Sequence, residues 1–336
     1  MDFGFVRAAC AAPALKVADC RYNAERIAEA AARAAEKGAA IATFPELCVT
    51  GSTCGELFLQ ATLQRGARDA LDFIAEKTAA LDMLIVVGAP LAAEAALFNC
   101  AFFLYRGAIL AAVPKTYIPN CRESYQKRYF ASGAGIRGGT VRLSARFDAV
   151  PFGTDIFICD KNNAEFVVGA EISDDLSAPL PPSCRAALSG ARIIVNLAAS
   201  NEIAGRAEQR RLLVAAQSAR TCAAYLYAGA ASDESSQDLI FGAHHLIAEV
   251  GDLLGENKPF AGSELYADID LERIALERRR TTIFADAAAL EALAFRRKRL
   301  SVYGRARVAP DSIASLCSRK QTGTQKTVRR RFADAD

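Results

Sequence analysis

Short apolar segments alternate with helix-like segments along most of the chain, and this alternation limits the folds that the sequence can adopt. Segments such as Asn23–Lys37 and Arg206–Ala223 have the length and the composition of helices. We expect further helices at 57–80 and near 183–188, and strands at 3–9, 40–44, 83–87, 97–105, 109–113, 166–170, 192–197, 224–228, 239–248 and 264–269. Hairpins and crossovers are mixed in this order, which predicts an α/β sandwich with helices outside the sheets.

The periodic pattern extends to about residue 284, so we expect one domain over residues 1–284. A chain of 336 residues with 52% hydrophobic residues can bury a sizeable core. Residues 285–300 are expected to form one more helix, and 301–336 a mobile tail, because that segment offers few apolar positions to offset the entropy of ordering.

The charge of the chain is unevenly distributed. The net charge is +3, but residues 296–336 contain 12 Lys or Arg and 3 Asp, so the rest of the chain is mildly acidic. A basic end of this kind fits either a nucleic-acid contact or a solvated terminus. We interpret it as a solvated terminus and expect no specific nucleic-acid partner.

Several classes of protein are excluded by simple patterns. No apolar run reaches the roughly 18–20 residues that cross a bilayer, and the N-terminus lacks the layout of a signal peptide. We therefore expect a cytoplasmic protein that has no membrane partner. The ten cysteines include no CxxC pair, which favours reduced thiols over a disulfide or zinc framework.

Neither a metal nor an organic cofactor is expected. The two histidines, His244 and His245, are neighbours and would point to opposite faces of a strand, which excludes a His-rich metal site and disfavours a Ser/His/Asp triad. Residues 133–138 match GxGxxG, but they follow the charged segment 122–128 rather than a strand. A dinucleotide site is therefore not expected there.

Three polar residues each follow the end of an apolar segment. Glu46 and Lys115 come directly after segments that end in Pro, and Ser173 follows the largely apolar segment 166–172. Strand ends are where α/β folds gather reacting groups, because the sheet fixes them while their tips stay accessible. Charged residues are also ordinary at the start of loops, so each position alone is weak support for a site.

Together, the three segments resemble the signatures of the nitrilase (carbon–nitrogen hydrolase) superfamily. They read Phe-Pro-Glu-Leu at 44–47, Val-Pro-Lys-Thr-Tyr-Ile-Pro at 113–119 and Gly-Ala-Glu-Ile-Ser-Asp-Asp-Leu at 169–176. The sequences of these segments are most similar to those of the N-terminal glutaminase domain of glutamine-dependent NAD synthetases, and the resemblance covers residues 1–284. It implies a four-layer αββα sandwich.

The resemblance also implies catalytic roles. In that family a glutamate base deprotonates a cysteine that attacks the amide of glutamine, and a lysine with a backbone N–H stabilises the oxyanion. Glu46 then corresponds to the base, Lys115 to the oxyanion stabiliser and Ser173 to the nucleophile position. Glu123 resembles a second glutamate, which orients the lysine.

Substrate-binding positions are implied in the same way. Ser200 and Arg206 resemble residues that contact glutamine, and a guanidinium can bind a carboxylate through two parallel hydrogen bonds. Ser52, Cys121 and Asp174 correspond to further positions of the pocket wall.

The pocket positions depart from the family pattern. Ser173 stands where the family has cysteine, Asp174 where it has glutamate and Ser177 where it has tryptophan, while Ser52 and Cys121 stand where the most similar relatives have tyrosines. An alkanol gives up its proton far less readily than a thiol, whose pKa is about 8.5. The sequence therefore predicts that glutamine hydrolysis is weakened or lost.

Three interpretations of function remain open. The first is a glutaminase-type amide hydrolase that supplies ammonia to NAD synthesis, with hydrolysis weakened. The second is a non-catalytic ligand-binding or oligomeric scaffold module. The third is an amidase of other specificity that uses Ser173, or Cys121 six residues past Lys115.

The partners expected from the resemblance follow the first interpretation. They are a small-molecule amide, further copies of the same chain, and a separate synthetase chain, because no SGGxDS-type pyrophosphate loop occurs in this sequence. This chain alone is not expected to make NAD.

Overall fold

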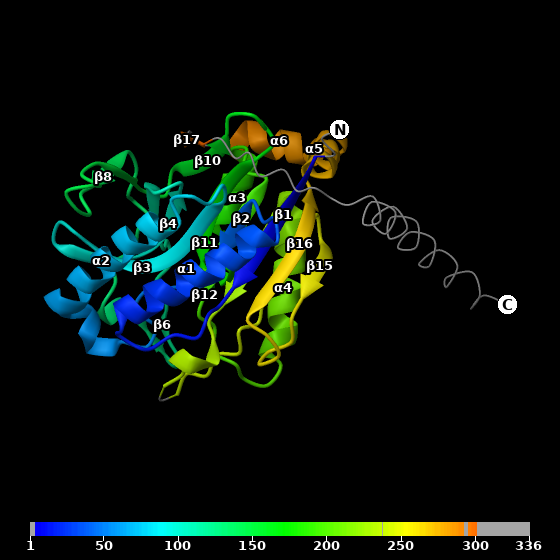
Figure 1. Cartoon of the computed structure of the whole chain (residues 1–336). Coiled ribbons are helices and arrows are strands. Elements are labelled where there is room, and N and C mark those ends of the chain that lie inside the picture. The colour runs from blue at the N-terminus through cyan, green and yellow to red at the C-terminus, as the bar shows by residue number, and fades with distance from the viewer. Residues whose placement is uncertain (1–3, 237, 292–294, 301–336) are drawn as a thin grey trace.

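The computed structural model describes residues 4–236, 238–291 and 295–300, which form two packed sheets with helices outside them (Figure 1). The first sheet has eight strands, in the order β16 (Glu264–Asp270), β1 (Phe5–Ala11), β2 (Ile41–Thr43), β3 (Leu84–Ala93), β4 (Ala96–Tyr105), β5 (Ala108–Pro114), β9 (Val150–Phe152) and β8 (Gly139–Val141). β1, β2 and β3 are parallel, and β4 reverses direction so that β5 runs with them again.

The second sheet has seven strands. Their order is β15 (Asp252–Glu256), β14 (Leu246–Glu249), β13 (Ala224–Gly229), β12 (Ile193–Ala198), β11 (Val167–Ile172), β10 (Ile156–Asp160) and β17 (Arg296–Leu300). β11, β12 and β13 are parallel and almost wholly buried, as expected for strands that are covered on both faces. A separate two-stranded hairpin consists of β6 (Asn120–Cys121) and β7 (Ser124–Tyr125).

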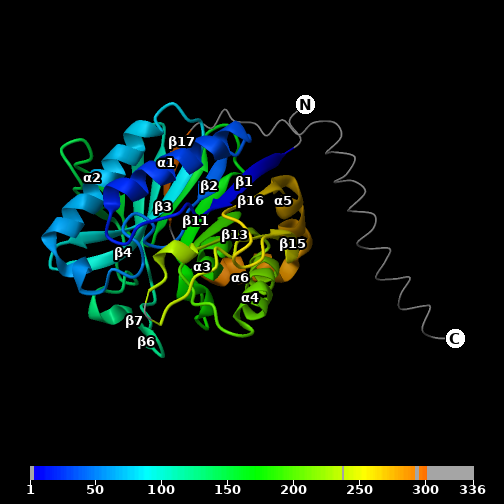
Figure 2. The same cartoon turned by 60° about the horizontal axis from the view of Figure 1, so that its bottom comes forward.

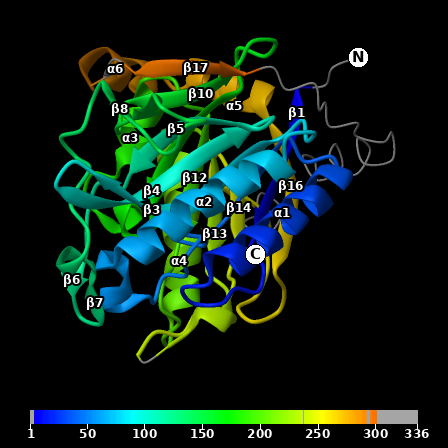
Figure 3. The ribbon, with the colours of Figure 1, turned by 60° about the vertical axis from the view of Figure 1, so that its left-hand side comes forward.

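Helices cover the outer face of each sheet. α1 (Cys20–Glu36) and α2 (Ala61–Lys77) lie side by side across the first sheet (Figure 3). α3 (Pro182–Leu188) and α4 (Arg206–Thr221) pack on the second sheet (Figure 2), and α5 (Leu271–Arg280) and α6 (Thr282–Glu291) follow β16. Short 3₁₀ helices lie at η1 (Gly55–Leu59), η2 (Gln126–Arg128), η3 (Ser173–Ser177) and η4 (Ser232–Glu234).

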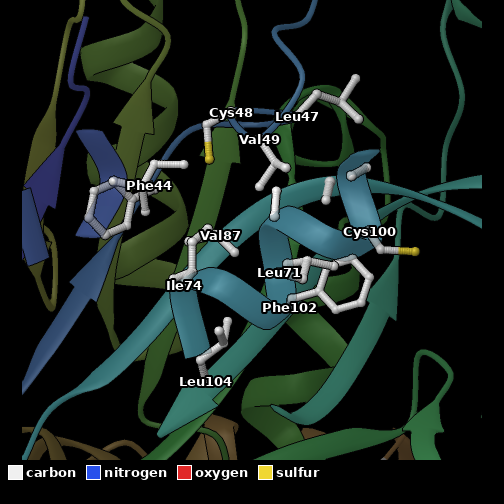
Figure 4. Close-up of a cluster of buried hydrophobic side chains, with 14 of the residues drawn as sticks. Phe44, Leu47, Cys48, Val49, Leu71, Ile74, Val87, Cys100, Phe102 and Leu104 are labelled. Atoms are coloured by element: carbon white, nitrogen blue, oxygen red, sulfur yellow. The ribbon is translucent and has the colours of Figure 1, made fainter. Parts of the chain in front are cut away.

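Three apolar clusters hold these layers together. One lies between the first sheet and its helices, where Phe44, Leu71, Ile74 and Phe102 meet (Figure 4). A second fills the space between the two sheets, and a third lies between the second sheet and α3 and α4. The predicted αββα sandwich is therefore confirmed.

α1 shows how the sequence specifies its layer. Its N-terminus is capped by Asp19, whose carboxylate accepts the N–H of Tyr22 at 3.1 Å. The residues that it buries are spaced three or four apart and are mostly alanine. Small side chains at this spacing allow the helix to lie close to the sheet.

The end of the packed body differs from the prediction. The expected helix over 285–300 is instead α6 followed by β17, which pairs in parallel with β10. Phe295 stacks on Phe157 with ring centroids 4.1 Å apart, and Arg296 forms a two-point ion pair with Asp155. The body thus continues past the boundary predicted at 284, while the predicted mobile tail, 301–336, lies outside the described residues.

The strand order places several carboxyl ends at one edge of the molecule. The chain leaves β2, passes through Phe44 and reaches that edge at Pro45. β3 lies directly beneath this segment. A Cβ at Gly88 of β3 would lie 2.3 Å from the backbone nitrogen of Leu47, so glycine is required for this close approach. Among the described helices, none is both long enough and apolar enough to cross a membrane.

Candidate active site

Glu46 lies at this edge, fully buried, at the centre of a set of hydrogen bonds. Its Oε1 accepts from Asn99 Nδ2 at 2.6 Å, from Lys115 Nζ at 2.8 Å and from Gln126 Nε2 at 3.3 Å. Its Oε2 accepts the backbone N–H of Ala199, which follows β12, at 3.1 Å. The carboxylate is therefore fixed by residues from both sheets.

Lys115 follows β5 and is also fully buried. Its ammonium contacts Glu46, the side-chain oxygen of Gln126 at 3.0 Å and a carboxylate oxygen of Asp174 at 3.5 Å. Burial lowers the pKa of Lys115, but the charges of Glu46 and Asp174 outweigh this effect and raise the pKa above its usual value. The side chain stays cationic.

Ser173 begins η3 at the end of β11, with a left-handed φ of 50°. Its backbone N–H donates to Asn196 Oδ1 at 2.8 Å, and Asn196 Nδ2 donates to its carbonyl at 3.3 Å. Its hydroxyl makes no hydrogen bond with another described residue, and the side chain lines a cleft. The next residue, Asp174, contacts Lys115, so the turn at 173 lies beside the buried ion pair.

The cleft has a volume of about 410 Å³. Six of the residues that were predicted for the site line it: Ser52, Glu123, Ser173, Asp174, Ser200 and Arg206. Aromatic side chains, among them Phe58, Tyr129 and Phe130, complete one wall.

Glu123 is placed differently from the role that the resemblance implied. Its carboxylate accepts from Asn201 Nδ2 at 3.4 Å, and its own backbone N–H and that amide lower its pKa. Among the described side chains, those that contact the Lys115 ammonium are Glu46, Gln126 and Asp174. Gln126, which sequence reasoning missed, therefore stands where an orienting carboxylate was expected.

Ser52 and Ser200 are held by neighbouring polar groups. Ser52 Oγ donates to the carbonyl of Glu46 at 3.1 Å, and its backbone N–H donates to Glu234 Oε2 at 2.7 Å. Ser200 Oγ accepts from Arg210 Nη2 at 3.3 Å. Both serines line the cleft, and hydrogen bonds to their backbones or side chains fix their positions.

Two arginines of α4 line the same wall. Arg206 begins the helix, donates to Gln209 at 3.3 Å and has a buried Nε with no hydrogen bond to a described residue. Arg210, which sequence reasoning missed, is buried and donates to Glu202 at 2.7 Å. Its spacing of four residues from Arg206, which puts both on one helix face, was the available signal.

Cys121 lies on β6, is exposed and is not among the residues that line the cleft. The hairpin instead contributes Glu123, Ser124 and Tyr125 to the cleft. Within the described ranges, no group of three or more His, Cys, Asp and Glu side chains is placed to hold a metal ion.

The arrangement can support nucleophilic chemistry at residue 173. A carboxylate that can accept a proton and an ammonium that can stabilise a negative oxygen form a buried ion pair, and the ammonium contacts Asp174, whose neighbour Ser173 lines the cleft. Polar and charged groups on the α4 wall can hold the remainder of a small polar ligand.

Comparison with known proteins identifies the family of the chain. Residues 7–279 match the family model described as carbon-nitrogen hydrolase. The chain is 40% identical over 285 residues to the glutamine-dependent NAD(+) synthetase of Mycobacterium tuberculosis, a match that covers 84% of this chain and 42% of that protein. The enzyme of the same name from Mycobacterium leprae is 36% identical over 294 residues, covering 85% of this chain and 43% of the relative. The chain thus spans less than half the length of these curated relatives.

Solved structures give the same result. A glutamine-dependent NAD(+) synthetase from Cytophaga hutchinsonii superposes with a TM-score of 0.69 at 26% identity, over 79% of this chain and 43% of that one. An amidase from Nesterenkonia sp. superposes with a TM-score of 0.62 at 20% identity, over 83% of this chain and 98% of the amidase. At that identity, the amidase supports the fold alone.

Proposed function

The chain belongs to the carbon–nitrogen hydrolase family, and we propose that its cleft is a glutaminase-type site for ammonia supply to NAD synthesis in which serine at position 173 weakens or abolishes hydrolysis. The observation that carries the proposal is the buried ion pair of Glu46 and Lys115 beside the turn at residue 173. The curated relatives that share this region are glutamine-dependent NAD synthetases.

The chemistry begins with a proton transfer. The Glu46 carboxylate accepts the proton of the side chain at 173, whose oxygen or sulfur then attacks the amide carbon of glutamine. Lys115 stabilises the negative oxygen that develops on the amide carbon. The amide nitrogen leaves as ammonia after taking up a proton, and water cleaves the resulting acyl-enzyme.

Serine makes the first step difficult. Serine hydrolases normally use His or Lys as the base for an alkanol, whereas Glu46 is a carboxylate. Loss of a nucleophile costs on the order of 10⁶-fold in rate in a well-studied hydrolase. We therefore expect little or no ammonia release by the chain as it stands.

Ammonia release from glutamine tests the proposal in the parent and in a set of variants. We expect the parent and Ser173→Ala to be equally inactive, and Ser173→Cys to gain measurable turnover that is lost again when Glu46→Gln is added. Robust turnover by the parent that Ser173→Ala abolishes would show that serine is competent. Turnover that survives Ser173→Ala but is lost in Cys121→Ala would move the nucleophile to the hairpin and favour an amidase of other specificity.

A ligand-binding module is the second candidate, and the unpaired side-chain groups of the cleft favour it. Arg206 Nε is buried without a partner among the described residues, and the Ser173 hydroxyl is likewise free to bind a ligand. Titration calorimetry of the parent with glutamine, together with the turnover of Ser173→Cys, distinguishes the glutaminase from the binding module. The module is supported if the parent binds glutamine and Ser173→Cys shows no turnover.

The same proposal includes partners. We expect association with a separate synthetase chain, because the relatives carry this region within a longer protein. Self-association is supported by α6, in which Ile283 and Leu290 are 76% and 84% exposed. Light scattering at high micromolar concentration tests it, and a strict monomer would contradict it.

The free thiols of the nine described cysteines support a cytoplasmic location.

A further inference from the structure

Three polar side chains lie on adjacent strands of the second sheet, on the face that the helices cover. Glu171 is on β11, Asn196 on β12 and Tyr225 on β13, and the Cα atoms of Glu171 and Asn196 are paired in the ladder. Tyr225 belongs to the apolar cluster between the second sheet and helices α3 and α4. All three side chains are at most 1% exposed.

A continuous chain of hydrogen bonds joins these residues to the turn at 173. Asn196 Nδ2 donates to the Tyr225 hydroxyl at 2.8 Å, and that hydroxyl donates to Glu171 Oε1. Asn196 also holds both backbone polar groups of Ser173, at 2.8 Å and 3.3 Å. One side chain therefore bonds the N–H and the carbonyl of the same residue.

The network allows only one orientation of the Asn196 amide. If the amide turned over, Nδ2 would face the Ser173 N–H, and the Tyr225 hydroxyl would face an acceptor while it already donates to Glu171. Glu171 is itself held, because the Ser183 N–H at the start of α3 donates to its Oε2 at 2.9 Å. The orientation of Asn196 is thus set by groups on the two neighbouring strands, β11 and β13, and at the start of α3.

The turn that Asn196 holds is strained. A left-handed conformation at a residue with a Cβ costs roughly 1–2 kcal/mol, and such conformations persist only where the surroundings impose them. Burial raises the pKa of Glu171, so the network also includes a carboxyl that is costly to keep in the interior. Apolar residues would fill the same space with less loss of stability.

We propose that Asn196, oriented by Tyr225 and Glu171, is a positioning residue that fixes the backbone of residue 173 for nucleophilic attack. This role rests on the proposed function. It explains why these polar side chains are buried among apolar ones. Their hydrogen bonds tie the turn that carries the reacting side chain to three strands of the sheet.

The test uses the thiol introduced by Ser173→Cys, in the full chain. Tyr225→Phe removes one hydroxyl from the network. Tyr105→Phe is the matched control, because the Tyr105 hydroxyl also donates to a carboxylate, that of Asp82, at 2.6 Å. Tyr105 is far from the candidate site, since it lies about 20 Å along β4 from Asn99. The rate of alkylation at 173 by iodoacetamide is followed against pH, with the labelled peptide identified by mass spectrometry because other cysteines also react.

We expect Tyr225→Phe to slow alkylation at 173 by about 10-fold to 100-fold and to shift its pH profile, whereas Tyr105→Phe changes neither. Where turnover is measurable, kcat should fall by a similar factor with KM unchanged. Equal melting temperatures for the two variants would exclude a general loss of stability. If Tyr225→Phe does not fold, Glu171→Met with Tyr225→Phe removes donor and acceptor together and keeps the comparison available.

Two outcomes separate this inference from the proposed function. Absence of ammonia release by Ser173→Cys contradicts the proposed function, yet the alkylation comparison still decides the positioning role. Alkylation rates and pH profiles that are the same in Tyr225→Phe and Tyr105→Phe would overturn the positioning role, whatever the turnover.

Discussion

The two sheets contribute unequal halves to the cleft. The first sheet supplies Glu46 and Lys115, which are fully buried and hydrogen bonded to one another and to their surroundings. The second sheet supplies Ser173, which is 6% exposed, and Asp174, whose side chain is 51% exposed, and both residues line the cleft. One half is part of the core, whereas the other forms the surface of the cleft.

This difference explains where the chain departs from the family pattern. A buried ion pair cannot lose one partner without leaving an uncompensated charge in the interior, so the fold itself preserves it. A side chain at the cleft surface can change at little cost to stability. Ser52, Ser173, Asp174 and Ser177 all lie on the cleft wall, and all differ from the residues that the resemblance implies.

The largest effect should come from breaking the buried half. We expect Lys115→Ala to lower the free energy of unfolding by about 3–5 kcal/mol, because it leaves Glu46 charged and unpaired, whereas Ser173→Ala should change it by less than about 1 kcal/mol. Urea unfolding at neutral pH measures both.

The double variant Glu46→Gln with Lys115→Met is the control for this prediction. Replacing both charges by groups of similar volume should restore most of the stability, because no unpaired charge remains. Equal losses of stability in Lys115→Ala and Ser173→Ala would contradict the division into a structural half and a surface half.

The same division limits what could be predicted from the sequence. Glu46, Lys115 and Ser173 were found because each follows an apolar strand, so local pattern and position agreed. Gln126 begins the three-residue 3₁₀ helix η2, directly after the β6–β7 hairpin, where no periodicity indicates which side chain turns toward Lys115. Its role depends on the path of the loop, which neither composition nor spacing specifies.

The strands that were missed have similar reasons. β8, β9 and β15 have three to five residues and contain Gly, Pro or Asp, so they lack a recognisable alternation. β17 reads Arg-Arg-Lys-Arg-Leu, a composition typical of a solvated segment, yet it forms the edge of the second sheet. Charged residues suit an edge strand, because they discourage pairing with another chain.

A second prediction concerns Glu234, which joins the two halves. It lies in η4, after β13 of the second sheet, and accepts the N–H of Ser52, which follows Glu46 in the first. Burial raises its pKa from the usual 4.5 to about 7. Such a carboxyl contributes stability that is fully present below its unfolded-state pKa and is lost as the pH rises through about 7.

Glu234→Gln should remove this part of the pH dependence. The parent should lose stability between about pH 5 and about pH 8, and Glu234→Gln should show a loss that is smaller by up to about 3 kcal/mol. This figure follows because one pKa unit corresponds to about 1.4 kcal/mol. Asp175, whose pKa burial also raises to about 7, remains in both proteins, so the variant keeps some pH dependence. An unchanged pH profile would show that Glu234 stays solvated.

The smallest effect should come from rebuilding the cleft wall. In the Ser173→Cys background, Ser52→Tyr with Ser177→Trp should lower KM for glutamine by about 10-fold, because added contacts of this size contribute on the order of 1–3 kcal/mol to ligand discrimination. The gain is limited because Ser52→Tyr removes the hydrogen bond from Ser52 Oγ to the Glu46 carbonyl. Cys121→Ala is the control and should leave KM and kcat unchanged, since Cys121 does not line the cleft. If Cys121→Ala alters KM as much as the paired wall change, Cys121 contacts the ligand, and the substrate-binding site extends beyond the residues that line the cleft here.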